Sequence, residues 1–109
     1  MFTHHSTEGY VEQFEGAKRR TMVWGEKTLL GEFHLAAGHA MPNHAHPHEQ
    51  AGYLISGKLR FNLPDESVLV GPGDAWCIPG DVPHQVDVLE DSVVIEVFAP
   101  CRDEFLPQD

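Results

Sequence analysis

The 109-residue sequence has few cysteines, few basic residues and no long apolar run. Two cysteines, Cys77 and Cys101, do not indicate a disulfide framework, which is typical of proteins from a reducing compartment. No apolar run approaches the ~20 residues of a membrane-spanning helix, and the first residues lack the basic and apolar regions of a secretory signal. We therefore expect a cytoplasmic protein without a membrane partner.

Positive charge is scarce, because 7 Lys and Arg stand against 17 Asp and Glu, for a net charge of −10 at pH 7. Nucleic acids and anionic membranes bind clustered cations, so neither is an expected partner. The composition, 41% hydrophobic and 22% charged, is typical of a globular protein. A chain of this length predicts a single domain over residues 1–109, with the polar residues 1–9 as a flexible tail.

Short runs of strand-forming residues alternate with turn residues from Thr28 onward, without a long amphipathic helix. Ser56-Gly57 and Glu90-Asp91 are predicted to be hairpin turns. Residues 11–23 could be helix or strand. Turns this frequent predict an all-β chain, an antiparallel sandwich or barrel. The predicted strands are 28–36, 51–55, 58–63, 68–70, 75–78, 85–89 and 92–99.

The predicted hairpin at Ser56-Gly57 indicates which way Gln50 points. A two-residue connection pairs Leu54 with Leu59 on one face, and Gln50 has the parity of Leu54. That face is apolar and therefore inward. Gln50 is predicted to point into the barrel, where its amide needs hydrogen-bond partners.

Histidines gather around residues 44–48 and at His84. In an extended chain, His44 and His46 point to the same face about 7 Å apart, so both could bind one metal ion or both could lie in a polar loop. His48 shares their parity, but Pro47 interrupts a continued strand. His84 shares a face with apolar residues and could be structural or a ligand.

The last predicted strand places Glu96 on one face with apolar neighbours. An unpaired buried carboxylate is costly, so Glu96 is either functional or exposed on an edge strand. Arg102 carries a planar fork suited to a carboxylate, and its alternatives are an ordinary surface residue or a partner of Asp103 or Glu104. Cys77 lies in an apolar strand and is expected to pack inside.

Two motifs resemble those of the cupin superfamily, and the resemblance covers roughly residues 25–100. It departs at Asp81 and Val88, and at Gln50, where most cupins have glutamate. The resemblance implies a cupin-type antiparallel β-barrel, jelly-roll-like, with a metal in its mouth. The matching residues are Gly38, His44, His46, Gln50 and Gly57 in the first motif, and Gly73, Pro79 and His84 in the second.

By this resemblance, one divalent transition metal is held by His44, His46, Gln50 and His84. Glu49 is the alternative to Gln50 if the register slips. With Gln50 the ligand set is neutral, which favours Lewis-acid chemistry. Imidazole ligands suit Zn, Ni, Fe, Co, Mn or Cu, and the sequence leaves the metal open.

A closer resemblance, to the KdgF-type pectin-degradation cupins, lies in residues 16–19, 44–50 and 98–106. That family opens the ring of 4,5-unsaturated uronates to give linear keto-acids. The resemblance implies a metal-dependent, isomerase-like enzyme with a small anionic sugar-acid substrate. Glu96 and Arg102 would be catalytic, and Phe98 and Arg102 would bind substrate. Glu96 stands where the family has aspartate, which lengthens the acid by one methylene.

Two other functions and an assembly state also follow from these patterns. Three histidines and one oxygen ligand suit an iron- or copper-dependent oxygenase as well, and the barrel could be a non-enzymatic metal- or sugar-binding module. A homodimer is predicted because an open barrel leaves strand edges uncovered. Tyr53 and Ile55 are the candidate contacts.

Overall fold

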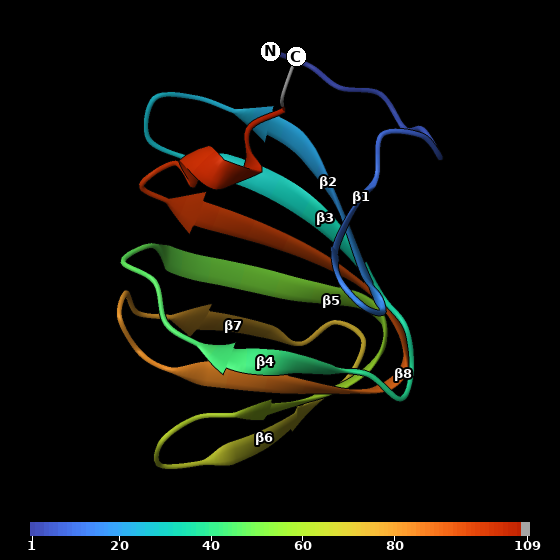
Figure 1. Cartoon of the computed structure of the whole chain (residues 1–109), viewed down its shortest axis with the longest axis vertical. Coiled ribbons are helices and arrows are strands. Elements are labelled where there is room, and N and C mark those ends of the chain that lie inside the picture. The colour runs from blue at the N-terminus through green and yellow to red at the C-terminus, as the bar shows by residue number, and fades with distance from the viewer. Residues whose placement is uncertain (108–109) are drawn as a thin grey trace.

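The computed structural model describes residues 1–107, which form eight β-strands and one short 3-10 helix (Figure 1). The predicted all-β, antiparallel architecture is confirmed. Residues 11–23, for which the sequence allowed helix or strand, form two strands. The elements are β1 (Val11–Phe14), β2 (Ala17–Trp24), β3 (Leu29–Leu35), β4 (Ala40–His44), β5 (Glu49–Asn62), β6 (Ser67–Val70), β7 (Ala75–Ile78), β8 (His84–Ala99) and η1 (Asp103–Phe105).

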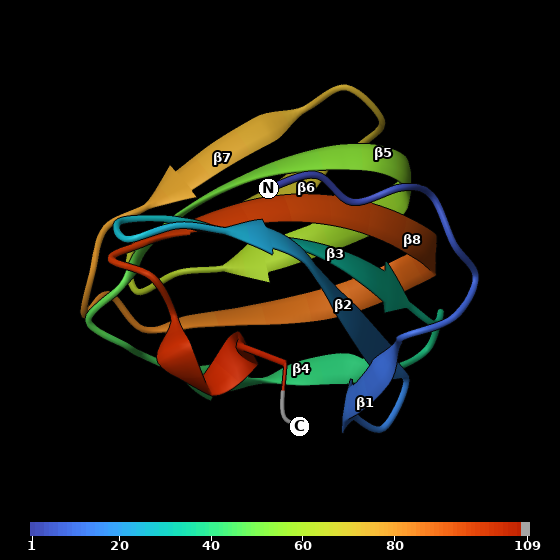
Figure 2. The same ribbon diagram turned by 90° about the horizontal axis from the view of Figure 1, so that it is seen from above.

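Two long strands, β5 and β8, organise the sheet by pairing with each other from end to end. The order is β1-β2-β3-β8-β5-β6, with β4 beside β8 and β7 beside β5. The first half of β8 pairs with β4 and its second half with β3, while β5 pairs first with β7 and then with β6. The sheet therefore folds into two facing layers joined by β5 and β8, as in a jelly roll (Figures 1 and 2).

Both predicted hairpins within β5 and β8 are wrong, because each strand continues through the supposed turn. Gly57 has φ 104°, and a Cβ there would lie 2.1 Å from Ser92 Oγ, so the position needs glycine for a bulge rather than a turn. Ser92 Oγ accepts the Lys58 N–H at 3.1 Å and donates to the Glu90 carbonyl at 2.7 Å. These bonds hold the bulge of β5 at Gly57 against residues 90–92 of β8.

The core lies between the inward faces of the two layers. Bulges between Leu54 and Leu59 return both residues to the interior, so the predicted inward face is right although its hairpin pairing is wrong. The expectation that Cys77 packs inside is wrong, because Cys77 is exposed. Side chains along β7 alternate between the two faces, and Ile78 takes the inward position. The buried apolar residues are Ala17, Leu29, Phe33, Leu35, Met41, Leu54, Leu59, Phe61, Val70, Ile78, Val86, Val88, Val94, Phe98 and Phe105.

The segment before β1 lies along β2. Thr3 Oγ1 donates to the Met22 carbonyl at 2.5 Å, and an Arg20 Nη2–H donates to the His4 carbonyl at 3.1 Å. Flexibility of residues 1–9 stays a prediction. Within residues 1–107, no helix is long and apolar enough to cross a membrane. Tyr53 and Ile55 point outward and are 46% and 48% exposed, and the homodimer stays a prediction.

Candidate metal centre

Three histidines converge at one end of the sandwich. Their potential ligand atoms, one from each of His44, His46 and His84, all lie within 4.8 Å of one another. His44 ends β4 and pairs directly with His84 at the start of β8, with ring centroids 4.4 Å apart. His46 follows in the next loop, with its ring 5.2 Å from that of His84. The structure thus brings together the three histidines chosen from the sequence.

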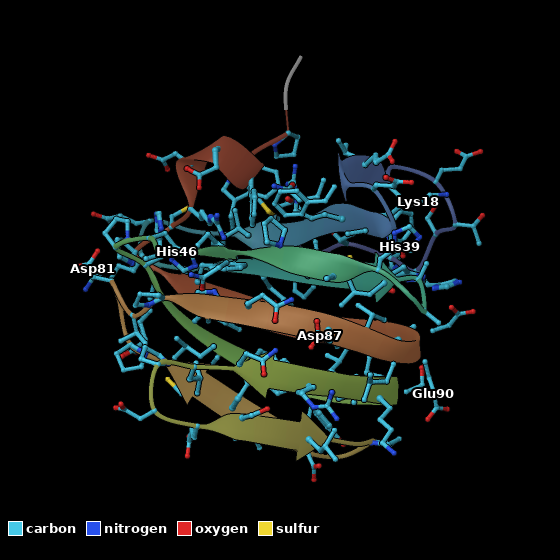
Figure 3. All side chains as sticks on the ribbon, turned by 60° about the horizontal axis from the view of Figure 1, so that its bottom comes forward. Lys18, His39, His46, Asp81, Asp87 and Glu90 are labelled. Carbon is cyan, nitrogen blue, oxygen red and sulfur yellow. The ribbon has the colours of Figure 1, made fainter. Side chains whose placement is uncertain are left out.

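A backbone contact joins the two loops that carry these rings. The Asp81 N–H donates to the His46 carbonyl at 2.7 Å, which ties the turn before His84 to the HxH segment. Asp81 has φ 65°, in the left-handed region that glycine adopts most readily. Figure 3 shows His46 and Asp81 at the same end of the molecule, whereas His39 lies at the other.

The tautomers of two histidines suit metal binding. His44 Nδ1 lies 2.9 Å from the Pro42 carbonyl and His84 Nδ1 lies 2.9 Å from the Val82 carbonyl, so both Nδ1 atoms must donate. Each neutral ring then keeps a lone pair on Nε2. Within residues 1–107, the buried His84 Nε2 has no protein partner. A buried imidazole nitrogen that has no protein partner and lies within the histidine cluster is suited to bind a metal.

Burial favours the neutral, metal-binding form of two of these rings. It lowers the pKa of His84, and it lowers the pKa of His46 together with the nearby charge of Arg102. A neutral imidazole is the form that coordinates a metal.

Gln50 joins the histidines to a carboxylate. Its Oε1 lies 2.7 Å from His46 Nε2, and its Nε2–H donates to Glu96 Oε2 at 2.6 Å. Neighbouring ligands about 2.1 Å from one ion are about 3 Å apart when they lie at right angles, so His46 Nε2 and Gln50 Oε1 could share an ion. Gln50 is only 5% exposed whereas Glu49 is exposed, so the geometry favours Gln50.

Glu96 points into the same interior as Gln50. Burial raises the pKa of its carboxyl to about 7, against the opposing effects of hydrogen bonds from Trp76 and Gln50 and of the Arg102 charge. Trp76 Nε1–H donates to Glu96 Oε2 at 3.4 Å. The indole fits only because Gly52 lies beneath it, since a Cβ at Gly52 would come within 2.3 Å of the ring. Trp76 is a site residue that its sequence context did not reveal.

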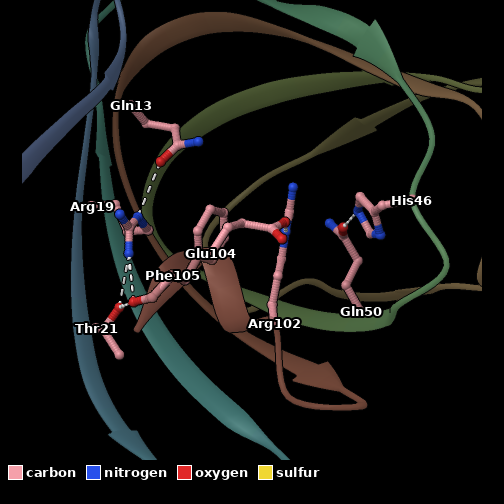
Figure 4. Close-up of polar contacts among 8 residues, drawn as sticks. All are labelled: Gln13, Arg19, Thr21, His46, Gln50, Arg102, Glu104 and Phe105. Carbon is pink, nitrogen blue, oxygen red and sulfur yellow. Dashed lines mark hydrogen bonds and ion pairs between the residues drawn. The ribbon is translucent and has the colours of Figure 1, made fainter. Parts of the chain in front are cut away.

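Arg102 is held over two aromatic rings, and Figure 4 shows it with one of them, Phe105. Its guanidinium carbon lies 5.0 Å from the Phe98 ring centre and 4.1 Å from that of Phe105. Its Nε–H donates to Glu104 Oε1 at 2.6 Å, as one of the sequence alternatives allowed. Phe98, expected to bind substrate, is buried against Arg102 and His46 and lines the cavity.

One cavity connects these groups and runs on into the apolar interior. Two histidines of the candidate metal cluster, His44 and His84, therefore face a shared space with an acid and a guanidinium. The polar residues that line it are Gln13, His44, Gln50, Trp76, His84, Glu96 and Arg102. Gln13 was missed because residues 11–23 carried no clear strand pattern.

Comparison with known proteins settles the family. The cupin domain profile matches residues 31–98, more than half of the chain. The chain belongs to the cupin family. Its fold agrees with an RmlC-like cupin from Shewanella frigidimarina, with a TM-score of 0.90 at 22% identity over 96% of this chain and 95% of that one.

Two relatives are both KdgF proteins. This cupin is 31% identical over 99 residues to the pectin degradation protein KdgF of Dickeya dadantii, covering 89% of this chain and 90% of that protein. The structure of KdgF from Halomonas sp. aligns with a TM-score of 0.90 at 28% identity, over 97% of this chain and all of that one. The predicted resemblance to KdgF-type proteins is confirmed.

Proposed function

We propose that this cupin is a metal-dependent, isomerase-like enzyme that opens the ring of a 4,5-unsaturated uronate or a related sugar acid. The observation that carries the proposal is the shared cavity, which combines His44 and His84 of the histidine cluster with Glu96 and Arg102. The relation to a protein named for pectin degradation supports a uronate substrate, since pectin is built from uronates.

The metal ligands in this proposal are His44, His46, Gln50 and His84. All four are uncharged as ligands, so a divalent ion there would act as a Lewis acid on oxygen atoms of the sugar. The buried, unpartnered Nε2 of His84 and the 2.7 Å approach of Gln50 Oε1 to His46 Nε2 support this set. Imidazole-rich ligands leave several transition metals possible.

Glu96 is the proton-transfer group in this mechanism. Ring opening breaks the bond between the anomeric carbon and the ring oxygen, and the anomeric hydroxyl loses its proton as it becomes an aldehyde. The ring oxygen leaves as an enolate, which gains a proton at carbon 4 and becomes a ketone, so the reaction is an isomerisation. One carboxylate facing the cavity can accept the first proton and return it in the second step.

Arg102 binds the substrate carboxylate in this mechanism. Its side chain is 14% exposed and is held by Glu104 through Nε, which leaves the Nη groups for a ligand. Phe98 and Phe105 support the guanidinium from below, so Phe98 acts on substrate binding through Arg102.

A ring-opening assay tests the proposal. The 4,5 double bond of the substrate is conjugated with its carboxylate, so its loss is followed by ultraviolet absorbance. We expect metal-loaded protein to accelerate the loss over the spontaneous reaction, with and without O₂, and a chelator to abolish the acceleration. A rate equal to the spontaneous one with each candidate metal would contradict the proposal.

A further inference from the structure

The cavity has a polar group on the wall opposite the histidines. Gln13 is the only partly buried residue of β1, whose other three residues are exposed. Its side chain lines the same cavity as Glu96 and Arg102. Figure 4 shows it across the barrel opening from His46 and Gln50, with Arg102 between them.

A neighbouring arginine fixes the orientation of the Gln13 amide. Arg19 Nε–H donates to Gln13 Oε1 at 3.1 Å. Because an Nε–H can only donate, the amide oxygen must face Arg19 and the NH2 group must point the other way, toward the interior (Figure 4). Within residues 1–107, no protein group accepts a hydrogen bond from this NH2 group.

Arg19 is itself held rigidly. Its Nη1–H donates to Thr21 Oγ1 and to the Phe105 carbonyl, both at 2.9 Å, and its guanidinium carbon lies 4.2 Å from the Phe105 ring centre. Thr21 Oγ1–H donates to the same carbonyl. The amide of Gln13 is therefore aimed by a fixed group rather than by a mobile surface side chain.

Within residues 1–107, Gln13 is the one polar residue that strands β1 to β3 contribute to the lining of the cavity. The other lining residues from these three strands are Phe14, Ala17, Phe33 and Leu35, all apolar. Two oriented N–H donors beside apolar side chains suit an oxygen atom of a bound molecule better than an apolar one. Arg19 and Arg102 both stack on Phe105, so this side of the cavity also attracts anions.

We propose that Gln13 is a substrate-contacting residue, whose NH2 group donates to a hydroxyl or carbonyl oxygen of the sugar acid, and that Arg19 positions it. This inference rests on the proposed uronate ring-opening function and extends the binding site beyond the metal, Glu96 and Arg102. Gln13 thereby selects ligands that carry an oxygen at the end facing β1.

The test compares Gln13→Leu, which keeps the size but removes both donors, with Glu12→Gln on the exposed face of the same strand. Turnover of a 4,5-unsaturated uronate gives KM and kcat, and calorimetry with D-galacturonate, a saturated probe, gives Kd. For Gln13→Leu we expect KM and Kd to rise about 3- to 10-fold, the loss of one uncharged hydrogen bond. Its kcat should change less than twofold, its metal content should stay the same, and Glu12→Gln should match the unmodified protein.

Arg19→Lys tests the positioning role, because lysine keeps the charge but lacks the Nε–H that faces Gln13. It should raise KM like Gln13→Leu, and the double variant should be no worse than Gln13→Leu alone. If Gln13→Leu loses stability, Gln13→Asn, which withdraws the NH2 group by one methylene, should show the same rise in KM with an unchanged melting temperature.

The outcomes separate the two claims. An active enzyme whose KM and Kd are unchanged in Gln13→Leu and in Gln13→Asn would overturn this inference and leave the ring-opening function in place. Independent, additive effects of Arg19→Lys and Gln13→Leu would overturn the positioning role. Unmodified protein that neither turns over the uronate nor binds galacturonate would overturn the proposed function, and this inference with it.

Discussion

Gln50 and Glu96 share a 2.6 Å hydrogen bond in which the carboxamide donates to the carboxylate. The other end of the same amide lies 2.7 Å from His46 Nε2. One neutral side chain thus links the candidate ligand set to the candidate acid. A glutamate in its place would put two carboxyl groups within hydrogen-bond distance, and one of them would have to keep a proton.

Gln50→Glu is therefore expected to retain the metal but to lose at least about 10-fold in turnover at neutral pH. The added negative charge weakens the Lewis acidity of the ion, and the proton shared with Glu96 is no longer free for transfer. Elemental analysis and the ring-opening assay on the same sample measure both effects. Undiminished turnover with full metal would show that the neutrality of this side chain is irrelevant.

The metal-free protein should become less stable as pH rises, because of Glu96. Its folded pKa of about 7 lies above the ordinary 4.5, so the folded state holds its proton more tightly than the unfolded state. This stabilisation is fully present below pH 4.5 and is lost as pH rises through about 7. The shift in pKa from 4.5 to about 7 corresponds to about 3 kcal/mol of folding free energy.

Glu96→Gln should remove that dependence. In chelator-treated samples we expect the variant to be more stable than the unmodified protein at pH 8, with a much smaller difference at pH 4. Denaturant unfolding at both pH values measures it, and equal differences at the two pH values would contradict a raised pKa. With metal bound, the same variant should lose about 10²- to 10⁴-fold in turnover, whereas Glu96→Asp should remain active.

His84→Ala should cost most of the bound metal, since it removes a buried Nε2 aimed at the cluster. His46→Ala should do the same. The control is His34→Ala, because His34 is exposed and pairs with Glu32 instead. Elemental analysis of untagged protein is the measurement, and stoichiometric metal in His84→Ala would show that the ligand set is wrong.

The sequence predicted the candidate site better than the path of the strands. Parity predicted that His44 and His46 share a face and that Gln50 points inward, because each lies in a short segment where local geometry decides the direction of a side chain. His84 and the complete ligand set came from the resemblance to the cupin motifs. The continuity of β5 and β8 was not predictable, because Gly57 resembles a turn residue and its role depends on Ser92, a partner distant in sequence.

Cys77 was placed wrongly and Gln13 was missed, for two different reasons. Cys77 was expected inside because both faces of β7 are apolar, so alternation gave no sign of the exposed side. Gln13 was missed because residues 11–23 carried no clear strand pattern, and the orientation of its amide depends on Arg19, which contacts Phe105 at the far end of the chain. Local pattern carries no information about such a contact.

Arg102→Lys should raise KM for an acidic sugar by more than it lowers kcat. Lysine keeps the charge but loses the bidentate fork, the Nε–H to Glu104 and the flat stacking on Phe98 and Phe105. The matched control is Arg60→Lys on β5, outside the cavity lining. Equal kinetic constants for Arg102→Lys and the unmodified enzyme would exclude a role for Arg102 in binding the carboxylate.

Gly52→Ala tests whether the Trp76 indole supports Glu96. The new Cβ would overlap the indole at 2.3 Å, so the ring must move and its N–H must leave Glu96 Oε2. Forcing a methyl group into a packed site typically costs about 1–3 kcal/mol, so the free energy of unfolding should fall by that amount.

Turnover of Gly52→Ala should fall further than that of Trp76→Phe, which removes the N–H but keeps most of the ring in place. Metal content should hold in both, because neither residue belongs to the ligand set. The control is Gly25→Ala, where a Cβ has open space. If Trp76→Phe turned over as fast as the unmodified enzyme, the indole would serve packing alone, and Glu96 would depend on Gln50 for its orientation.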